Sequence, residues 1–445
     1  MKNMVVDLIV CSATPRHRMR LFALALLLSA LSISLQAAKP EPYGEHFVVA
    51  GEQWSDAKVG VAKQGINVAP TPVGEEKRFL NHLHGLEGEG GPYSDALAEP
   101  LTDLARHHRQ QGDLASARKA YQRALHVVRV NDGLYSERQV PILQELFELY
   151  RVSGDMETLD ARYDYFFRLY GGGEPPFNRV RLGAALEYIR WQREAIRLQL
   201  SDSKTKRLLE IYTLNRDLLE AVAGDSDVDQ DLYRDLVLSQ LRNFYLIQSR
   251  FETKEELQET GPSIRMAATW GETEDLNQHR MEVIQRRSLR RGRELLEQLI
   301  ASTPAEDTQA VARAYLELGD WNQWNDKTEE ALAAYVEVER LLRDSDRDTL
   351  LQKWLGEPRE LPANGAFWQP VVRPPGETPV LVAANFDVLP KGRADNIETI
   401  PATEEQEREA SKVRRYLRNT RFRPRIADGE AHSTAQLARQ YEVLD

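Results

Sequence analysis

The sequence of 445 residues holds a single cysteine, Cys11, and this residue precedes the one long apolar run. If that run is a cleaved leader, the mature chain has no thiol, which excludes a disulfide framework and a cysteine nucleophile. The sequence also lacks the Gly-x-Ser-x-Gly turn of serine hydrolases and the His-Glu-x-x-His helix of zinc peptidases. These absences favour a protein that is not an enzyme.

Basic residues are in deficit, because 58 Lys and Arg stand against 69 Asp and Glu and give a net charge of −11. We therefore expect no nucleic-acid partner for so acidic a chain. His82 and His84 form a His-x-His pair, but no third ligand follows at a definite spacing. We interpret them as solvated loop histidines and expect no metal. We expect no cofactor either, since no glycine-rich phosphate loop follows a predicted strand.

The long apolar run, residues 21–33, follows three arginines and leads into a stretch of small residues. This is the layout of a secretory signal peptide, and the run is short for a membrane span. We predict a signal peptide over residues 1–37, and Met19 within it is an alternative start of translation. If the leader is not cleaved, it is an anchor in the inner membrane, and only in that case do we expect membrane contact.

A repeat of 42 residues is the strongest pattern in the chain. It aligns Tyr93 with Tyr135, Ser94 with Ser136, Leu101 with Leu143, Leu104 with Leu146, Gly112 with Gly154, Asp113 with Asp155 and Tyr121 with Tyr163. In each unit, apolar residues at helical spacing flank a Gly-Asp turn, so each unit is a helical pair that buries its apolar face by stacking on its neighbours. A third unit with this spacing lies between Tyr315 and Val338.

This pattern resembles the tetratricopeptide repeat at its small and large positions. The resemblance implies an α-solenoid whose groove binds a protein or peptide, lined by polar residues on the first helix of each unit. Those positions here are Thr102, Arg106, Arg109, Gln144, Glu148 and Arg151. The alternative is that these side chains only form a solvent-exposed polar face and bind no partner.

The character of the chain changes along its length. We expect a mainly α protein: a partly ordered lead-in over residues 38–91, the tetratricopeptide-like solenoid over 92–355, a proline-rich linker over 356–379, and a small α+β domain over 380–445. Within the last segment, alternating residues predict strands near 382–388, 396–400 and 437–443, and helical periodicity predicts a helix over 404–419.

The tail carries Phe386-Asp387-Val388-Leu389-Pro390-Lys391-Gly392 before its helix and Arg421-Phe422-Arg423-Pro424 with Asp428-Gly429 after it. This order resembles the C-terminal domain of the TonB energy-transducer family. The resemblance implies a Gram-negative periplasmic module that touches an outer-membrane receptor or another envelope partner, often by adding a strand to a sheet edge. The chain departs from the family because it has no long spacer rich in proline and lysine.

Two basic clusters stand out. One occupies a single predicted helix and comprises Arg280, Arg286, Arg287, Arg290, Arg291 and Arg293. We interpret it mainly as a solvated surface that pairs with Glu282, Glu294 and Glu297. The other lies in the tail, where Arg415, Arg418, Arg421 and Arg423 are candidates for docking an acidic partner.

The principal hypothesis is a non-enzymatic periplasmic scaffold that binds one partner in the helical groove and docks on a second through the tail. A membrane-anchored accessory or transducer component of TonB-dependent transport is the alternative. An enzyme whose site lies between the two domains is the second alternative.

Overall fold

The computed structural model describes residues 42–43, 47–49, 74–200, 204–223, 229–258, 271–367, 380–401 and 406–443. The signal peptide expected over residues 1–37 lies outside these ranges. The described chain is mainly helical, as the sequence predicts, with a small region of strands built chiefly from its C-terminal part.

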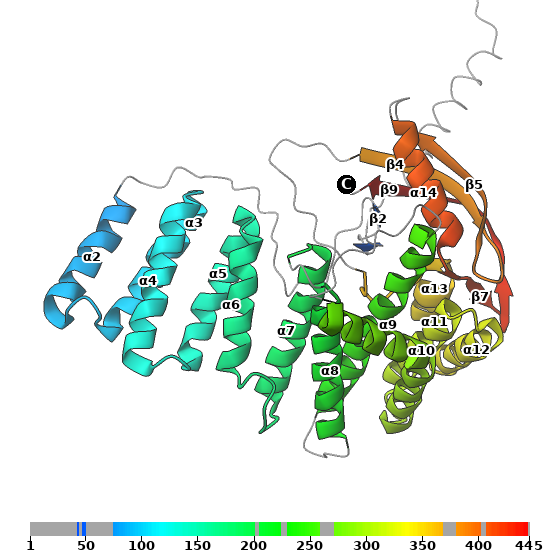
Figure 1. The fold of residues 1–445 in the computed structure, drawn as a ribbon, viewed down its shortest axis with the longest axis horizontal. Helices are drawn as coiled ribbons and strands as arrows, with labels where there is room; N and C mark the ends of the chain where they lie inside the picture. Colours follow the sequence, from blue (N-terminus) through cyan, green and yellow to red (C-terminus); the bar gives the residue numbers. More distant parts are fainter. Residues whose placement is uncertain are drawn as a thin grey trace, which may run out of the picture.

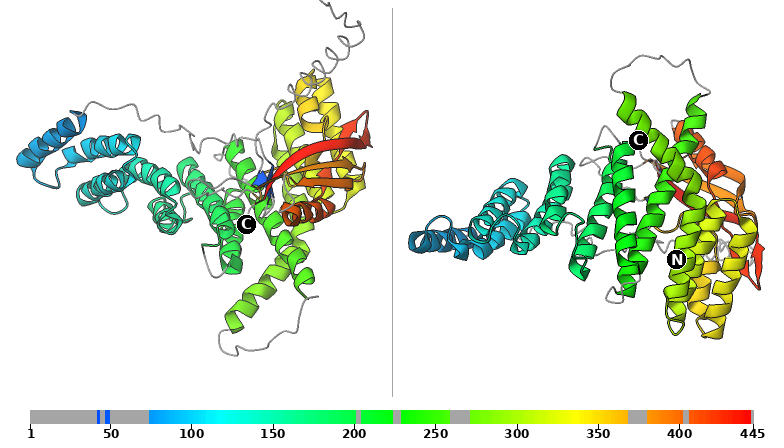
Figure 2. Two further views of the ribbon diagram at one scale, coloured as in Figure 1. Left: turned by 90° about the horizontal axis from the view of Figure 1, so that it is seen from above. Right: turned by 60° about the horizontal axis from the view of Figure 1, so that its bottom comes forward.

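All but the last of the described helices stand side by side in chain order, and the strand region lies against one end of this row (Figure 1). The helices of the row are α2 Glu75–Gly90, α3 Ala98–Gln110, α4 Leu114–Asp132, α5 Val140–Ser153, α6 Met156–Leu169, α7 Arg179–Arg197, α8 Lys204–Val222, α9 Gln230–Gln258, α10 Gly271–Ser302, α11 Thr308–Trp324, α12 Thr328–Asp344 and α13 Asp348–Leu355. The last helix, α14 Glu407–Asn419, packs on the strands instead. Figure 2 shows the row from two further sides, with the N-terminal helices at the end away from the sheet.

The repeat units share local structure as well as sequence. Gly112 and Gly154 have φ values of +78° and +74°, a region that favours glycine, and each ends the first helix of its unit. The aspartates that follow, Asp113 and Asp155, are the N-caps of α4 and α6, and each accepts a hydrogen bond from the amide three residues on. The Gly-Asp pair therefore ends one helix and starts the next.

Large and small residues of the repeat pack between successive helices. Tyr121 and Tyr163 are 0% and 6% exposed, and the ring of Tyr163 stacks on that of Trp191 at 4.7 Å. In the third unit, a Cβ on Gly319 would lie only 2.3 Å from the ring of Tyr335. A side chain at this glycine would therefore force the two helices apart.

The helical row begins earlier than the sequence predicts. Helix α2 lies within the expected lead-in, and its Leu83 joins the same apolar cluster as Leu97 and Leu101 of the next unit. His82 and His84 therefore lie on a helix and not in a loop, which corrects our interpretation of this segment. Several glycines interrupt the apolar pattern of α2, so its sequence shows little helical periodicity.

The main sheet has the order β1-β2-β9-β4-β5, with antiparallel neighbours. Its strands are β1 Pro42–Tyr43, β2 Phe47–Val49, β4 Val380–Val388, β5 Ala394–Pro401 and β9 Thr434–Val443. The three predicted tail strands and the predicted helix are confirmed as β4, β5, β9 and α14. Strand β2 comes from the lead-in segment, more than 300 residues from its partner β9 in sequence. The N-terminal side of the chain thus extends the C-terminal sheet.

The segment expected to be a linker contributes packed structure. Strand β3 Arg359–Glu360 pairs with β6 Phe422–Arg423. Glu360 is 7% exposed and accepts hydrogen bonds from the phenols of Tyr416, at 3.1 Å, and Tyr441. Leu361 and Phe367 are also buried. The expectation of a linker from residue 356 onward is therefore wrong for residues 359–367, where Pro358 and Pro362 interrupt the periodicity that would indicate burial.

The tail is held against α11, α12 and α13 by polar contacts. Gln323 Nε2 donates to the carbonyl of Lys391 at 2.8 Å. The carboxylate of Glu339 accepts from the amides of Asp428 and Gly429, also at 2.8 Å, at the turn between β7 Arg425–Ala427 and β8 Glu430–His432. Because Glu339 is only 4% exposed, this contact fixes the tail to α12.

Candidate functional site

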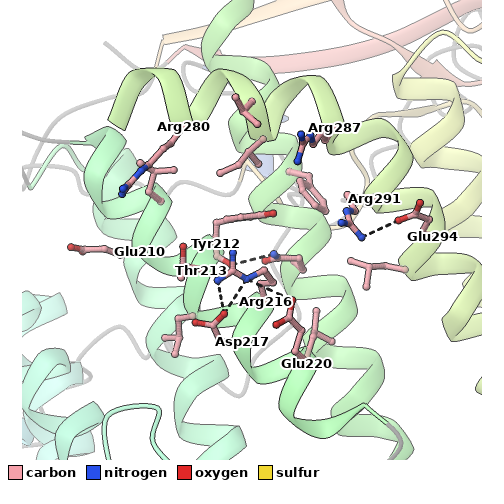
Figure 3. A pocket seen from close by; sticks show the side chains of 18 of the residues that line it. Glu210, Tyr212, Thr213, Arg216, Asp217, Glu220, Arg280, Arg287, Arg291 and Glu294 are labelled. Atoms are coloured by element: carbon pink, nitrogen blue, oxygen red, sulfur yellow. Dashed lines mark hydrogen bonds and ion pairs between the residues drawn. The ribbon is translucent and has the colours of Figure 1, made fainter. Parts of the chain in front are cut away.

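A groove of about 1370 Å³ opens between α8, α9 and α10 (Figure 3). Helix α9 supplies its floor, with Tyr233, Gln240 and Phe244, while α8 and α10 form the two walls. A concave surface of this size, formed by facing helices, is suited to bind a ligand or a segment of a partner.

The floor of the groove is mainly aromatic and is tied to the α8 wall. Phe244 is 2% exposed, and its ring lies 5.6 Å from that of Tyr212 on α8. Gln240 Nε2 donates to the carbonyl of Tyr212 at 3.2 Å, which ties α9 to α8. Burial raises the pKa of the Tyr212 phenol, although Arg216 opposes this effect. Tyr212 is therefore a neutral hydrogen-bonding group at physiological pH.

The α8 wall is rimmed by charges that pair with each other. Arg216 bonds to Asp217 at 2.6 Å and lies 3.8 Å from Glu220, and Lys206 lies 3.9 Å from Glu210. All five side chains are well exposed. Exposed pairs of this kind contribute at most about 1 kcal/mol each, so a partner can replace them at little cost.

The α10 wall carries three arginines that line the groove, Arg280, Arg287 and Arg291. Arg291 pairs with Glu294 at 3.3 Å. Among the side chains that the structure describes, Arg280 and Arg287 have no carboxylate within 4.0 Å. The expected surface pairing is therefore correct for part of this cluster, including Arg286 with Glu282 at 4.0 Å, but not for these two arginines.

The groove residues expected from the repeat lie elsewhere, on α3 and α5. Thr102 is 8% exposed and donates to the carbonyl of Ala98, so its prediction as a groove residue is wrong. Arg106 and Arg109 both bond to the carboxylate of Glu145, at 3.0 and 2.8 Å. These ion pairs join neighbouring repeat units, so both arginines already have a partner within the chain.

The remaining expected groove residues lie on α5. Gln144 is exposed, whereas Glu148 is half-buried and burial raises the pKa of its carboxyl. Arg151 pairs with Glu194 of α7, which is 2% exposed. Arg106 and Arg109 thus share the carboxylate of Glu145, whereas Arg151 pairs with Glu194.

The tail arginines divide into two pairs. Arg415 and Arg418 are exposed on α14, as a docking surface requires. Arg421 bonds to Asp326 at 3.0 Å, and Arg423 is 4% exposed and pairs with Asp320 of α11. The prediction that Arg423 docks an external partner is therefore wrong, because its charge is used inside the protein.

In the described residues, no group of three or more His, Cys, Asp or Glu side chains is placed to hold a metal ion. His84 Nδ1 lies 2.8 Å from the carbonyl of Leu80, one turn earlier on α2. No helix within the described ranges is both long and apolar enough to cross a bilayer.

The sequence does not predict the groove between α8 and α10. Its walls belong to the part of the helical array that shows no copy of the 42-residue repeat. The one available signal was the arginine cluster, whose members Arg280, Arg287 and Arg291 recur at seven and four residues and so share a helix face. The apolar floor could not be found without knowing which helices meet.

A comparison with models of known protein families finds no match, and neither does a comparison with curated protein sequences. No relative therefore assigns a role to any residue of the groove. Its function is inferred from its shape, its apolar floor and its charges.

Proposed function

We propose that the chain is a non-enzymatic scaffold that holds a segment of a protein partner in the groove between α8 and α10. The observation that carries this proposal is an open groove with a charged rim, lined by aromatic side chains such as Tyr212 and Phe244 and by aliphatic ones such as Ile284. Apolar floors supply affinity and charged rims supply orientation in helical-groove recognition.

We also propose that the helical array is a tetratricopeptide-like solenoid. It is supported by the 42-residue repeat, by the caps Asp113 and Asp155 at equivalent positions, and by the buried Tyr121 and Tyr163. Repeat arrays of stacked helices present extended surfaces to partners.

We propose that the tail is a TonB-C-like module that docks on a second component of the cell envelope. Among the described strands, β5 lies at one edge of the main sheet with β4 as its single neighbour. Ile400 on this strand is 52% exposed, and Arg415 and Arg418 lie on the neighbouring α14. An unpaired strand edge can accept a strand from a partner.

Replacing Thr213 with tryptophan tests the groove proposal. Thr213 is exposed on α8 and lines the groove, so a bulky ring there fills the space that a partner would occupy. We expect affinity purification of tagged chain from periplasmic extract to recover partners with the natural sequence and to lose them, by about tenfold or more, with Thr213→Trp.

Ala221→Trp is the matched control, because Ala221 is exposed on the same helix but does not line the groove. It should retain the partners of the natural sequence. Equal recovery by all three proteins would contradict the proposal.

Amino-terminal sequencing of the same preparation tests whether the leader is cleaved. It should find a mature start at Ala38, and an intact leader would contradict cleavage and favour the anchored alternative.

A further inference from the structure

Away from the ends of α8, the walls of the groove offer no main-chain hydrogen bonds to a ligand. Helices α8, α9 and α10 run through the lining residues, and their backbone N–H groups are used within each helix. A buried extended peptide would therefore have unsatisfied N–H and C=O groups over an apolar floor, which is costly. A helical ligand pairs its own backbone groups and avoids this cost.

The dimensions of the groove suit a helix. Its lining runs from Lys206 of α8 to Ala223, the residue after that helix, and from Asn277 to Gln298 on α10. At about 1.5 Å per residue these walls are about 25 and 32 Å long, which accommodates a helix of about 17 to 20 residues. Such a helix would bury an apolar stripe against Tyr212 and Phe244.

The charges of the α10 wall define one flank of the ligand. Arg280 and Arg287 are exposed and lie seven residues apart, a separation of about 10.5 Å along the helix. No carboxylate lies within 4.0 Å of either among the described side chains, in a chain whose net charge is −11. Two carboxylates separated by two helical turns on the ligand would complement these arginines.

We infer that the groove takes an amphipathic helix of a partner protein, with an apolar stripe facing α9 and acidic residues seven apart facing Arg280 and Arg287. This inference rests on the proposed function and adds the conformation and the charge pattern of the ligand. The same arginines favour a partner with an acidic flank over a segment with a basic one.

Binding of a designed peptide to the full chain tests the inference. The probe is a labelled peptide of 18 residues with leucines at helical spacing and two glutamates seven apart, followed by fluorescence anisotropy. We expect saturable binding that is at least about tenfold tighter than that of the same peptide with glutamine at both positions. Affinity should fall as salt is raised, because the paired charges are exposed at the rim.

Variants of the protein test whether Arg280 and Arg287 cause the preference for the glutamate peptide. The double variant Arg280→Glu/Arg287→Glu should remove most of the preference for glutamate over glutamine. Arg286→Glu is the control, because Arg286 lies on the same helix but outside the groove lining, and it should change the affinity by less than about twofold. A peptide with proline at its centre should not bind, because proline breaks the helix.

Three results would overturn the inference: no saturable binding, equal affinity for the glutamate and glutamine peptides, or equal affinity for the proline peptide, which indicates an extended ligand. Self-association that Arg287→Glu abolishes would overturn it as well, by showing that a second copy occupies the groove. If Thr213→Trp loses partners while the peptides show no charge preference, the helix inference fails and the scaffold proposal stands. If Thr213→Trp loses nothing, the proposed function itself fails.

Discussion

Replacing Arg423 with alanine should lower the free energy of unfolding by about 3–5 kcal/mol, because it leaves the carboxylate of Asp320 buried without its cation. Both side chains are about 4% exposed, and Arg423 Nη2 donates to Asp320 Oδ2 at 3.1 Å. Arg423 Nη1 also donates to the carbonyl of Trp354 at 2.8 Å. The substitution therefore removes the contact that joins β6 to α11 and α13. Urea denaturation followed by circular dichroism measures the loss.

The loss should depend on pH. Burial raises the pKa of Asp320 from 3.8 to about 6, against the opposing effect of Arg423. Without the arginine this pKa rises further, so a protonated and neutral Asp320 is tolerated as the pH falls. Arg423→Ala should therefore lose more free energy of unfolding, relative to the natural sequence, at pH 8 than at pH 5.

Arg425→Ala is the control, because Arg425 is exposed two residues further along the chain. It should change stability by no more than about 0.5 kcal/mol at either pH. An equally small loss of stability for Arg423→Ala, or a loss that grows as the pH falls, would contradict the conclusion that Arg423 and Asp320 form a buried ion pair that holds the tail.

Replacing Trp321 with alanine should destabilise the protein by about 3–5 kcal/mol, the usual range for removing a buried aromatic side chain. Trp321 is 0% exposed on α11, and its Nε1 donates to the carbonyl of Leu289 at 3.0 Å. Its ring lies 4.9 Å from that of Tyr245, and a Cβ on Gly292 would lie 2.5 Å from it. The tryptophan thus fills the junction of α9, α10 and α11 beside the groove.

Leu276→Ala on α10 is the control for Trp321, since Leu276 is 59% exposed. Its effect should stay within about 0.5 kcal/mol. Thermal unfolding and hydrogen exchange of α9 and α10 together measure the change. If the amide hydrogen-exchange rates of α9 and α10 were unchanged in Trp321→Ala, the packing of these two helices would not depend on the tryptophan.

Much of the helical array could be predicted from local sequence. The Gly-Asp pairs at Gly112 and Gly154 predict helix ends because few other residues adopt positive φ so readily. The tail strands follow from alternation, since Val382, Ala384 and Phe386 are buried at every second position. These features depend on neighbours a few residues away, which a sequence pattern records.

The remaining features depend on pairs distant in sequence. Arg423 meets Asp320 across 103 residues, and β2 pairs with β9 across almost the whole chain. No periodicity records which helices meet, so the groove lining that Tyr212 and Phe244 form together cannot be anticipated from the sequence. For the same reason Arg423 could not be distinguished by sequence from the exposed Arg418.

A photo-crosslinking residue placed at Thr213 in growing cells reports what occupies the groove. We expect a covalent adduct with a protein partner, through a segment that mass spectrometry maps to a helix with an acidic flank. The same residue placed at Ala221 should give no such adduct. Equal labelling at the two positions, or no adduct at Thr213, would show that the groove does not hold a partner helix.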